Sequence, residues 1–96
     1  MLVVSDASPL NVLVRIGHVE VLPTLFHAVI IPSAVAEELA RPSTPEVVRN
    51  WLAARPGWLE VRSPTGADIP SLPRHRGERE AIKLAQELRA DLVARR

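Results

Sequence analysis

The sequence predicts an α/β fold in which helices cover a parallel β-sheet. Short apolar runs rich in β-branched residues alternate along the chain with amphipathic segments, which is typical of parallel strands joined by helical crossovers. The chain has 96 residues, enough for one small domain over residues 1–96 and too few for two independent cores. Hydrophobic residues make up 47% and charged residues 24%, close to the globular average, which argues against a disordered or fibrous chain.

The first strand is predicted over residues 2–4, where a continuous apolar run ends at the polar pair Ser5 and Asp6. A helix is expected to follow directly, with Ser8 as its N-cap and Pro9 as its first helical residue. In a parallel sheet the ligand crevice lies beyond the carboxyl ends of the strands. The sequence therefore predicts that the carboxylate of this polar pair lies at a functional edge.

The middle of the chain continues the alternation of helices and strands. A short helix is expected over residues 19–26 and a second strand over residues 28–31. Residues 33–40 predict a helix that Pro42 ends, and Thr44 is the predicted cap of a further amphipathic helix. This half of the chain therefore supplies one crossover from the second strand to a third.

The last third of the chain predicts two more strands and the most regular helix. Residues 58–62 alternate well enough for an edge strand, and a proline-rich connection follows over residues 63–75. Residues 77–89 carry alanine and leucine at helical spacing, and residues 91–93 begin one more strand. The two tryptophans are assigned to core or interface packing and not to base stacking.

Charge and composition limit the partners and the compartment. Twelve basic residues against eleven acidic ones give a formal net charge of +1, unlike the concentrated positive charge of a dedicated nucleic-acid binder. The absence of cysteine excludes disulfides and thiolate chemistry. No basic segment followed by a long apolar run begins the chain, so we expect no membrane span and a soluble, cytoplasmic protein.

Asp6 is the first candidate site residue, because it follows a buried strand and lies near the positive N-terminus of the next helix. Helix capping explains an acid or a serine at this place equally well. Ser8 keeps the same two interpretations: its hydroxyl caps the helix, or it orients a carboxylate and a water molecule on a metal ion. Capping alone is the simpler interpretation of each residue.

Glu37 and Glu38 are neighbours on a predicted helix, so their side chains point about 100° apart and only one can face a shared site. If Val35 and Leu39 face the core, Glu37 lies on the more exposed side. Glu38 is therefore the second candidate. A solvated helix face is the alternative interpretation.

Glu78 and Glu80 open the last helix, where carboxylates favour the helix dipole irrespective of function. Glu78 lies in the first turn and is expected to project toward the strand ends, whereas Glu80 turns away and is kept as a secondary candidate. Three carboxylates from separate segments offer the oxygen ligands that a hard divalent cation prefers, with space for water and phosphate. No Ser/His/Asp arrangement, phosphate-binding glycine loop or zinc spacing competes with this interpretation.

Four segments in this order resemble the PIN-domain family: residues 3–10 (VVSDASPL), 30–32 (IIP), 35–39 (VAEEL) and 77–82 (GEREAI). More narrowly, the sequence is similar to the branch related to the toxins of toxin–antitoxin pairs. The resemblance spans nearly the whole chain. It implies a three-layer α/β/α fold, a ribonuclease site of acidic residues that binds Mg²⁺ or Mn²⁺, an RNA substrate and an antitoxin protein as partner.

Carried over position by position, the resemblance implies a role for each candidate. Asp6 matches the first acid, Ser8 the nearby hydroxyl, Glu38 the helix acid and Glu78 the third acid, with Glu80 as the alternative for the third. In the mechanism that the family implies, the metal activates water for attack on an RNA phosphodiester and offsets the charge that develops.

The sequence departs from the family pattern at its end. Relatives continue past residues 90–93 into a strand with a further acid, and this position has no counterpart here. Asp91 is expected at the opposite end of its strand and does not replace it. Missing cover over one sheet face favours a homo-oligomer. Two functions lead: a metal-dependent ribonuclease, whose activity truncation could impair, and an inactive PIN remnant that binds a partner protein or its own copy. A third, a nucleic-acid-binding module without cleavage, is disfavoured by the near-zero net charge.

Overall fold

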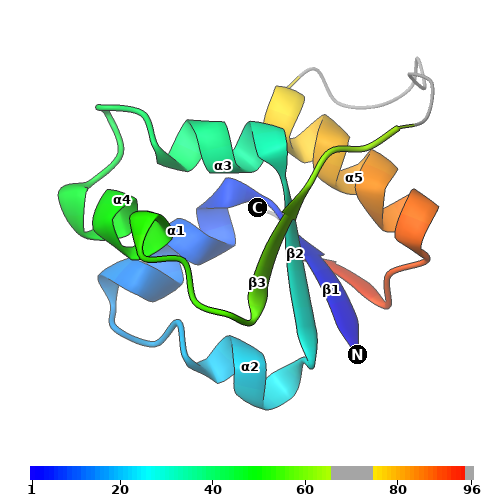
Figure 1. Ribbon diagram of the computed structural model, residues 1–96, viewed down its shortest axis with the longest axis horizontal. Coiled ribbons are helices and arrows are strands. Elements are labelled where there is room, and N and C mark those ends of the chain that lie inside the picture. Colours follow the sequence, from blue (N-terminus) through cyan, green and yellow to red (C-terminus); the bar gives the residue numbers. More distant parts are fainter. Residues whose placement is uncertain (66–74, 95–96) are drawn as a thin grey trace.

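A computed structural model describes residues 1–65 and 75–94 and shows a four-stranded, all-parallel sheet with helices on both faces (Figure 1). The predicted α/β fold class is confirmed. Among the described residues, no helix is long and apolar enough to cross a membrane. In chain order the elements are β1 (Leu2–Ser5), α1 (Ala7–Arg15), α2 (Val21–Leu25), β2 (Ala28–Pro32), α3 (Ser33–Leu39), α4 (Glu46–Ala53), β3 (Leu59–Arg62), α5 (Arg76–Leu88) and β4 (Leu92–Ala94).

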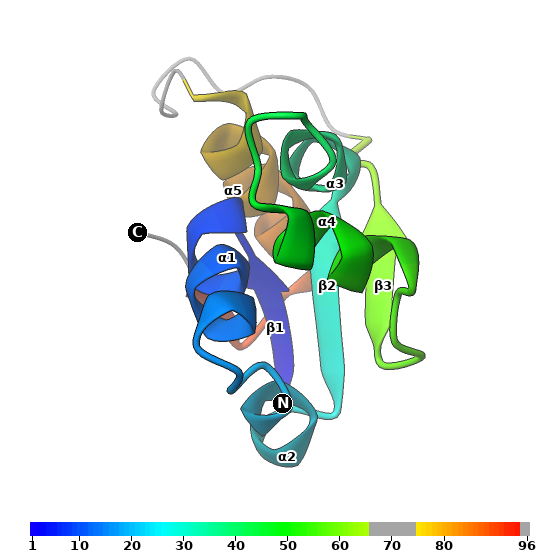
Figure 2. The same cartoon turned by 90° about the vertical axis from the view of Figure 1, so that its left-hand side faces the viewer.

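The strand order, β3-β2-β1-β4, reverses beside β1. The chain first moves from β1 through β2 to β3, and α5 then carries it back to the other side of β1. Figure 2 shows α1 and α4 covering one face of the sheet, while α5 lies on the other. In open parallel sheets the ligand crevice forms at the carboxyl ends of the two strands between which the order reverses. Here those strands are β1 and β4.

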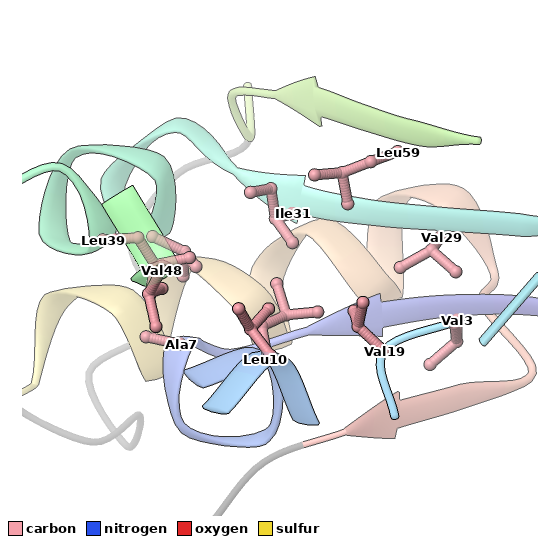
Figure 3. Packing of buried hydrophobic residues seen from close by; sticks show 11 residues of the cluster. Val3, Ala7, Leu10, Val19, Val29, Ile31, Leu39, Val48 and Leu59 are labelled. Atoms are coloured by element: carbon pink, nitrogen blue, oxygen red, sulfur yellow. The ribbon is translucent and has the colours of Figure 1, made fainter. Parts of the chain in front are cut away.

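Successive residues of β1 point to opposite faces of the sheet, and both faces are buried. Val3 joins the larger apolar cluster with α1, α3 and α4 (Figure 3), whereas Val4 joins a smaller cluster with Ile30 and α5. Burial on both faces explains why the strands are continuous apolar runs. Trp51 and Trp58 pack against the larger cluster with ring centroids 5.9 Å apart, as the packing interpretation predicts.

The N-cap of α1 is Asp6, so the prediction that Ser8 caps this helix is wrong. Asp6 has extended backbone, and its Oδ1 accepts a hydrogen bond from the backbone N–H of Ala7 at 2.7 Å. The helix begins at Ala7, and Pro9 is its third residue, where the missing N–H costs no helical hydrogen bond. Asp6 and not Ser8 caps the helix, because α1 begins almost directly after the end of β1.

The prediction that Thr44 caps α4 is also wrong. The helix begins at Glu46 with Pro45 as its N-cap. The Thr44 hydroxyl instead donates a hydrogen bond to the carbonyl oxygen of Glu38 at 2.9 Å. This contact ties the connection between α3 and α4 to the end of α3.

The remaining elements lie within two residues of their predicted bounds, and β3 is an edge strand as expected. Helix α5 begins one residue earlier than predicted and ends one residue earlier, because Arg89 adopts a left-handed conformation with a φ of 52°. Most of the predicted proline-rich connection, residues 66–74, lies outside the described residues, as do residues 95–96.

Candidate functional site

Asp6 is fixed at the carboxyl end of β1 by its backbone and by its side chain. Its N–H donates to the carbonyl oxygen of Ala94 in β4 at 2.8 Å, and its carboxylate caps α1. The residue is only 5% exposed. Within residues 1–65 and 75–94, no arginine, lysine or histidine forms an ion pair with it. A buried carboxylate without a cationic partner is costly, so this position favours a bound cation.

Glu38 reaches the same place from the last turn of α3. Gly77, the second residue of α5, marks where the two acids meet. A Cβ atom added at Gly77 would lie 3.1 Å from Glu38 Oε1 and 3.3 Å from Asp6 Oδ1. The two carboxylate oxygens are therefore separated by no more than the sum of these distances. Glycine leaves open the space into which both carboxylates point.

The structure separates the two glutamates of α3 as their spacing predicts. The side chain of Glu37 is 60% exposed, whereas that of Glu38 is 27% exposed. Val35 and Leu39 are buried in the larger cluster and set this orientation. Glu38 is thus the acid of this pair that faces the end of β1.

The two candidates on α5 have different surroundings. Glu78 is half-buried and follows Gly77 directly, so its backbone lies beside the space that the other two acids share. Glu80 is held in an ion pair with Arg76, with Oε2 2.9 Å from Nε. In the part of the chain that is described, no group of three or more acidic or histidine side chains is arranged to hold a metal ion. The structure brings Asp6 and Glu38 together and does not join Glu78 to them.

Two basic side chains that sequence reasoning missed lie beside the acids. His75 Nε2 is 3.6 Å from Glu38 Oε1, and Arg76 pairs with Glu37 as well as with Glu80. The hydrogen bond with Glu80 and the negative charge of Glu37 raise the pKa of Arg76 above its ordinary value. One signal in the sequence could have indicated this region: a glycine stands in the first turn of the helix, where it is a poor helix former.

Ser8 and Asp91 contribute less to this site. Ser8 is half-buried in the first turn of α1, and its hydroxyl makes no hydrogen bond with another described residue. Asp91 Oδ2 accepts a hydrogen bond from the N–H of Leu2 at 2.8 Å, at the start of β1. It therefore lies at the opposite end of the sheet from Asp6, as expected.

A family model described as a PIN domain matches residues 2–95. The chain belongs to the PIN-domain family. No curated protein and no solved structure matches the sequence. PIN domains have a nuclease-type fold, generally bind nucleic acid and generally use divalent metal ions.

The acidic pair of this PIN domain fits such a metal. Carboxylate oxygens are the donors that Mg²⁺ and Mn²⁺ prefer. Asp6 and Glu38 supply them at the point where the strand order reverses, and the missing side chain at Gly77 keeps the space between them open. A divalent cation there would offset the repulsion between the two carboxylates.

Proposed function

We propose that this PIN domain is a metal-dependent ribonuclease with Asp6, Glu38 and Glu78 as its metal ligands and Mg²⁺ or Mn²⁺ as its cofactor. One observation carries the proposal: a buried Asp6 carboxylate, which has no ion-pair partner among the described residues, meets Glu38 in the space that Gly77 leaves open. The family supports the reaction class, because PIN domains have a nuclease-type fold.

Each acid has a distinct part in this proposal. Asp6 is the rigid ligand, because its backbone and its capping bond fix it at the end of β1. Glu38 and Glu78 approach from α3 and α5, with Glu80 as the alternative to Glu78. When bound, the metal supplies a Lewis acid that activates water and stabilises the charge developing on a phosphodiester. Ser8 stands in the same turn as Asp6 and is proposed to orient that water.

The surface around the acids suits a phosphate backbone. The side chains of His75 and Arg76 are 53% and 56% exposed, and both lie beside the glutamates of α3. Exposed basic side chains are the usual contacts of protein with phosphate. We place the substrate, an RNA strand, over this rim. By the resemblance of its motifs, the proposed biological role is that of a toxin with an antitoxin protein as partner.

The test is a calorimetric titration of Mn²⁺ into the wild type and into Asp6→Asn, with the oligomeric state recorded on each sample. Asparagine keeps the cap of α1, because its side-chain oxygen accepts the same hydrogen bond. We expect Mn²⁺ binding by the wild type and a loss of at least about tenfold in affinity in the variant, since a ligand is removed. Asp91→Asn is the matched control, because this acid lies at the opposite end of the sheet.

Cleavage of a short RNA in the presence of Mn²⁺ completes the test. The wild type and Asp91→Asn are expected to cleave it, and Asp6→Asn is not. A folded wild type that binds no Mn²⁺ would contradict the proposal. The same holds for metal-dependent cleavage that survives Asp6→Asn at the wild-type rate.

A second candidate function is binding of a partner protein or a second copy without catalysis. A groove of about 460 Å³ between α5 and β4 favours it, because β4 is an edge strand of the described sheet and offers unpaired backbone groups. The groove is lined by Ile82, Ala85, Gln86, Arg89, Ala90 and Val93. A protein that stays monomeric at high micromolar concentration in light scattering, and that binds Mn²⁺, would speak against this candidate.

A further inference from the structure

Arg76 joins the two helices that carry the proposed ligands. Its Nη1 lies 2.7 Å from Glu37 Oε2 on α3, and its Nε lies 2.9 Å from Glu80 Oε2 on α5. Glu37 directly precedes Glu38, and Glu80 follows Glu78 by two residues. Through these two side chains, the guanidinium links α3, which carries Glu38, to α5, which carries Glu78.

The stability of α5 does not account for an arginine at this position. Arg76 is the first residue of the helix, where a cation opposes the helix dipole. Arginine followed four residues later by glutamate is also the less favourable order for a pair within a helix. Moreover, the side chains of Arg76 and Glu37 are more than half exposed, and ion pairs with such exposure contribute little to folding.

The guanidinium group is suited to fixing the relative position of the helices. It is planar, and its donors point in fixed directions, so two acceptors bound to different nitrogens have a defined separation. Positioning is needed here because the approaching carboxylates of Asp6 and Glu38 repel each other, which tends to separate α3 from the end of β1. Helix α5 packs against Val4 of β1, so the Arg76 bridge between α3 and α5 opposes this movement from outside the acidic space.

We propose that Arg76 is a positioning residue that holds α3 and α5 at the spacing at which Glu38 and Glu78 act on one metal ion. This inference rests on the proposed function, because it concerns the same acidic site. In this role Arg76 does not contact the metal ion. It acts through Glu37 and Glu80.

The sign of the effect on Mn²⁺ affinity distinguishes positioning from simple charge. Arg76→Gln removes a positive charge and frees two carboxylates, so electrostatics alone predict tighter Mn²⁺ binding. Positioning predicts the opposite. We expect affinity in calorimetry to fall by about tenfold or more, the usual effect of losing a residue that orients metal ligands. Arg76→Lys keeps the charge without the planar fork and is expected to restore binding only in part.

Arg79→Gln is the matched control. Arg79 lies one turn along the same helix, and its guanidinium forms no ion pair within the described part of the chain. The variant loses the same charge, and its Mn²⁺ affinity is expected to equal or exceed that of the wild type. A second readout needs no metal: amide hydrogen exchange in α3 and in the first turn of α5 is expected to be faster in Arg76→Gln than in Arg79→Gln.

The outcomes separate this inference from the proposed function. A wild type that binds no Mn²⁺ overturns both. A wild type that binds Mn²⁺, with Arg76→Gln binding it equally or more tightly, overturns the positioning role alone. If Arg76→Gln does not fold by circular dichroism, Arg76→Lys decides the question: binding at full wild-type affinity overturns the role, and weakened binding in a folded variant supports it.

Discussion

Gly77 determines how closely the acidic side chains can approach α5. In Gly77→Ala the new Cβ would lie 3.1 Å from Glu38 Oε1 and 3.3 Å from Asp6 Oδ1, closer than ordinary van der Waals contact. Both carboxylates would have to move, so we expect Mn²⁺ affinity to fall by about tenfold, as when ligand orientation is lost. Calorimetric titration of the folded variant measures this.

Stability is expected to change little in the same variant. Alanine favours a helix over glycine by about 0.5–1 kcal/mol, and crowding against Val35 Cγ2 at 3.3 Å opposes that gain. Gly57→Ala is the control, because a Cβ added there meets no heavy atom within 4 Å. Equal Mn²⁺ affinity in Gly77→Ala and the wild type would show that this space is not part of the metal site.

The sequence predicts the position of a residue where local patterns fix it, and does not predict contacts between elements that are far apart in the chain. Asp6 was predictable because it ends a buried strand, and Glu38 because Val35 and Leu39 fix the orientation of α3. The contacts of Arg76 were not predictable, because they depend on how α3 and α5 approach each other in space. The place of Glu78 relative to the other acids follows no local rule either.

At the scale of elements, α5 ends at a residue other than glycine whose backbone is left-handed and therefore strained. Arg89 terminates the helix with φ 52° and ψ 49°, a left-handed conformation that glycine adopts without a Cβ clash. We expect Arg89→Gly to raise the free energy of unfolding by about 0.5–1 kcal/mol, because the relief of this strain exceeds the entropy cost of glycine. A urea titration with an unchanged slope measures the gain.

Arg89→Ala separates backbone strain from loss of the side chain. Alanine removes the arginine side chain and keeps the Cβ, so no gain in stability is expected. A similar gain in both variants would assign the effect to the side chain, which lines the groove between α5 and β4.

Helix boundaries show why elements were predictable and their caps were not. In the described residues, apolar periodicity placed the strands and the helices α2, α3 and α5 within two positions of their bounds. The caps depended on which side chain is placed to form the hydrogen bond. Asp6 and not Ser8 caps α1, and the Thr44 hydroxyl donates to the carbonyl oxygen of Glu38 instead of capping α4. Such choices depend on where the preceding strand or helix ends in space.

At the scale of the molecule, the sheet separates two apolar clusters of unequal size. The cluster on the side of α1, α3 and α4 is the larger. Among the residues that the structure describes, the cluster under α5 has five buried members, Val4, Ile30, Ala81, Leu84 and Ala85. The sequence predicted a parallel sheet, but the return of α5 across the opposite face depends on the fit of these residues. Helix α5 is thus the layer held by fewer apolar contacts and is expected to open before the rest.

The proposed site lies across the contact between α5 and the rest of the domain, because Glu78 is on α5 whereas Asp6 and Glu38 are not. A metal ion bound by all three would tie α5 to the remainder of the domain. Ligand present at 100 times its dissociation constant stabilises a folded protein by about 2.7 kcal/mol. For a domain of this size that corresponds to a rise in Tm of roughly 10–20 °C. We therefore expect Mn²⁺ at this concentration to raise the Tm of the wild type and to raise that of Asp6→Asn by no more than about half as much.

The location of the protection tests the same coupling between layers. Hydrogen exchange with Mn²⁺ present is expected to slow most in α5, because its opening would require release of the metal. If Mn²⁺ raises the Tm without protecting α5, the ion is held by Asp6 and Glu38 alone, and Glu78 is not a ligand. Protection of α5 that is undiminished in Asp6→Asn would instead place the ion away from the end of β1, because the rigid ligand would be missing from the site.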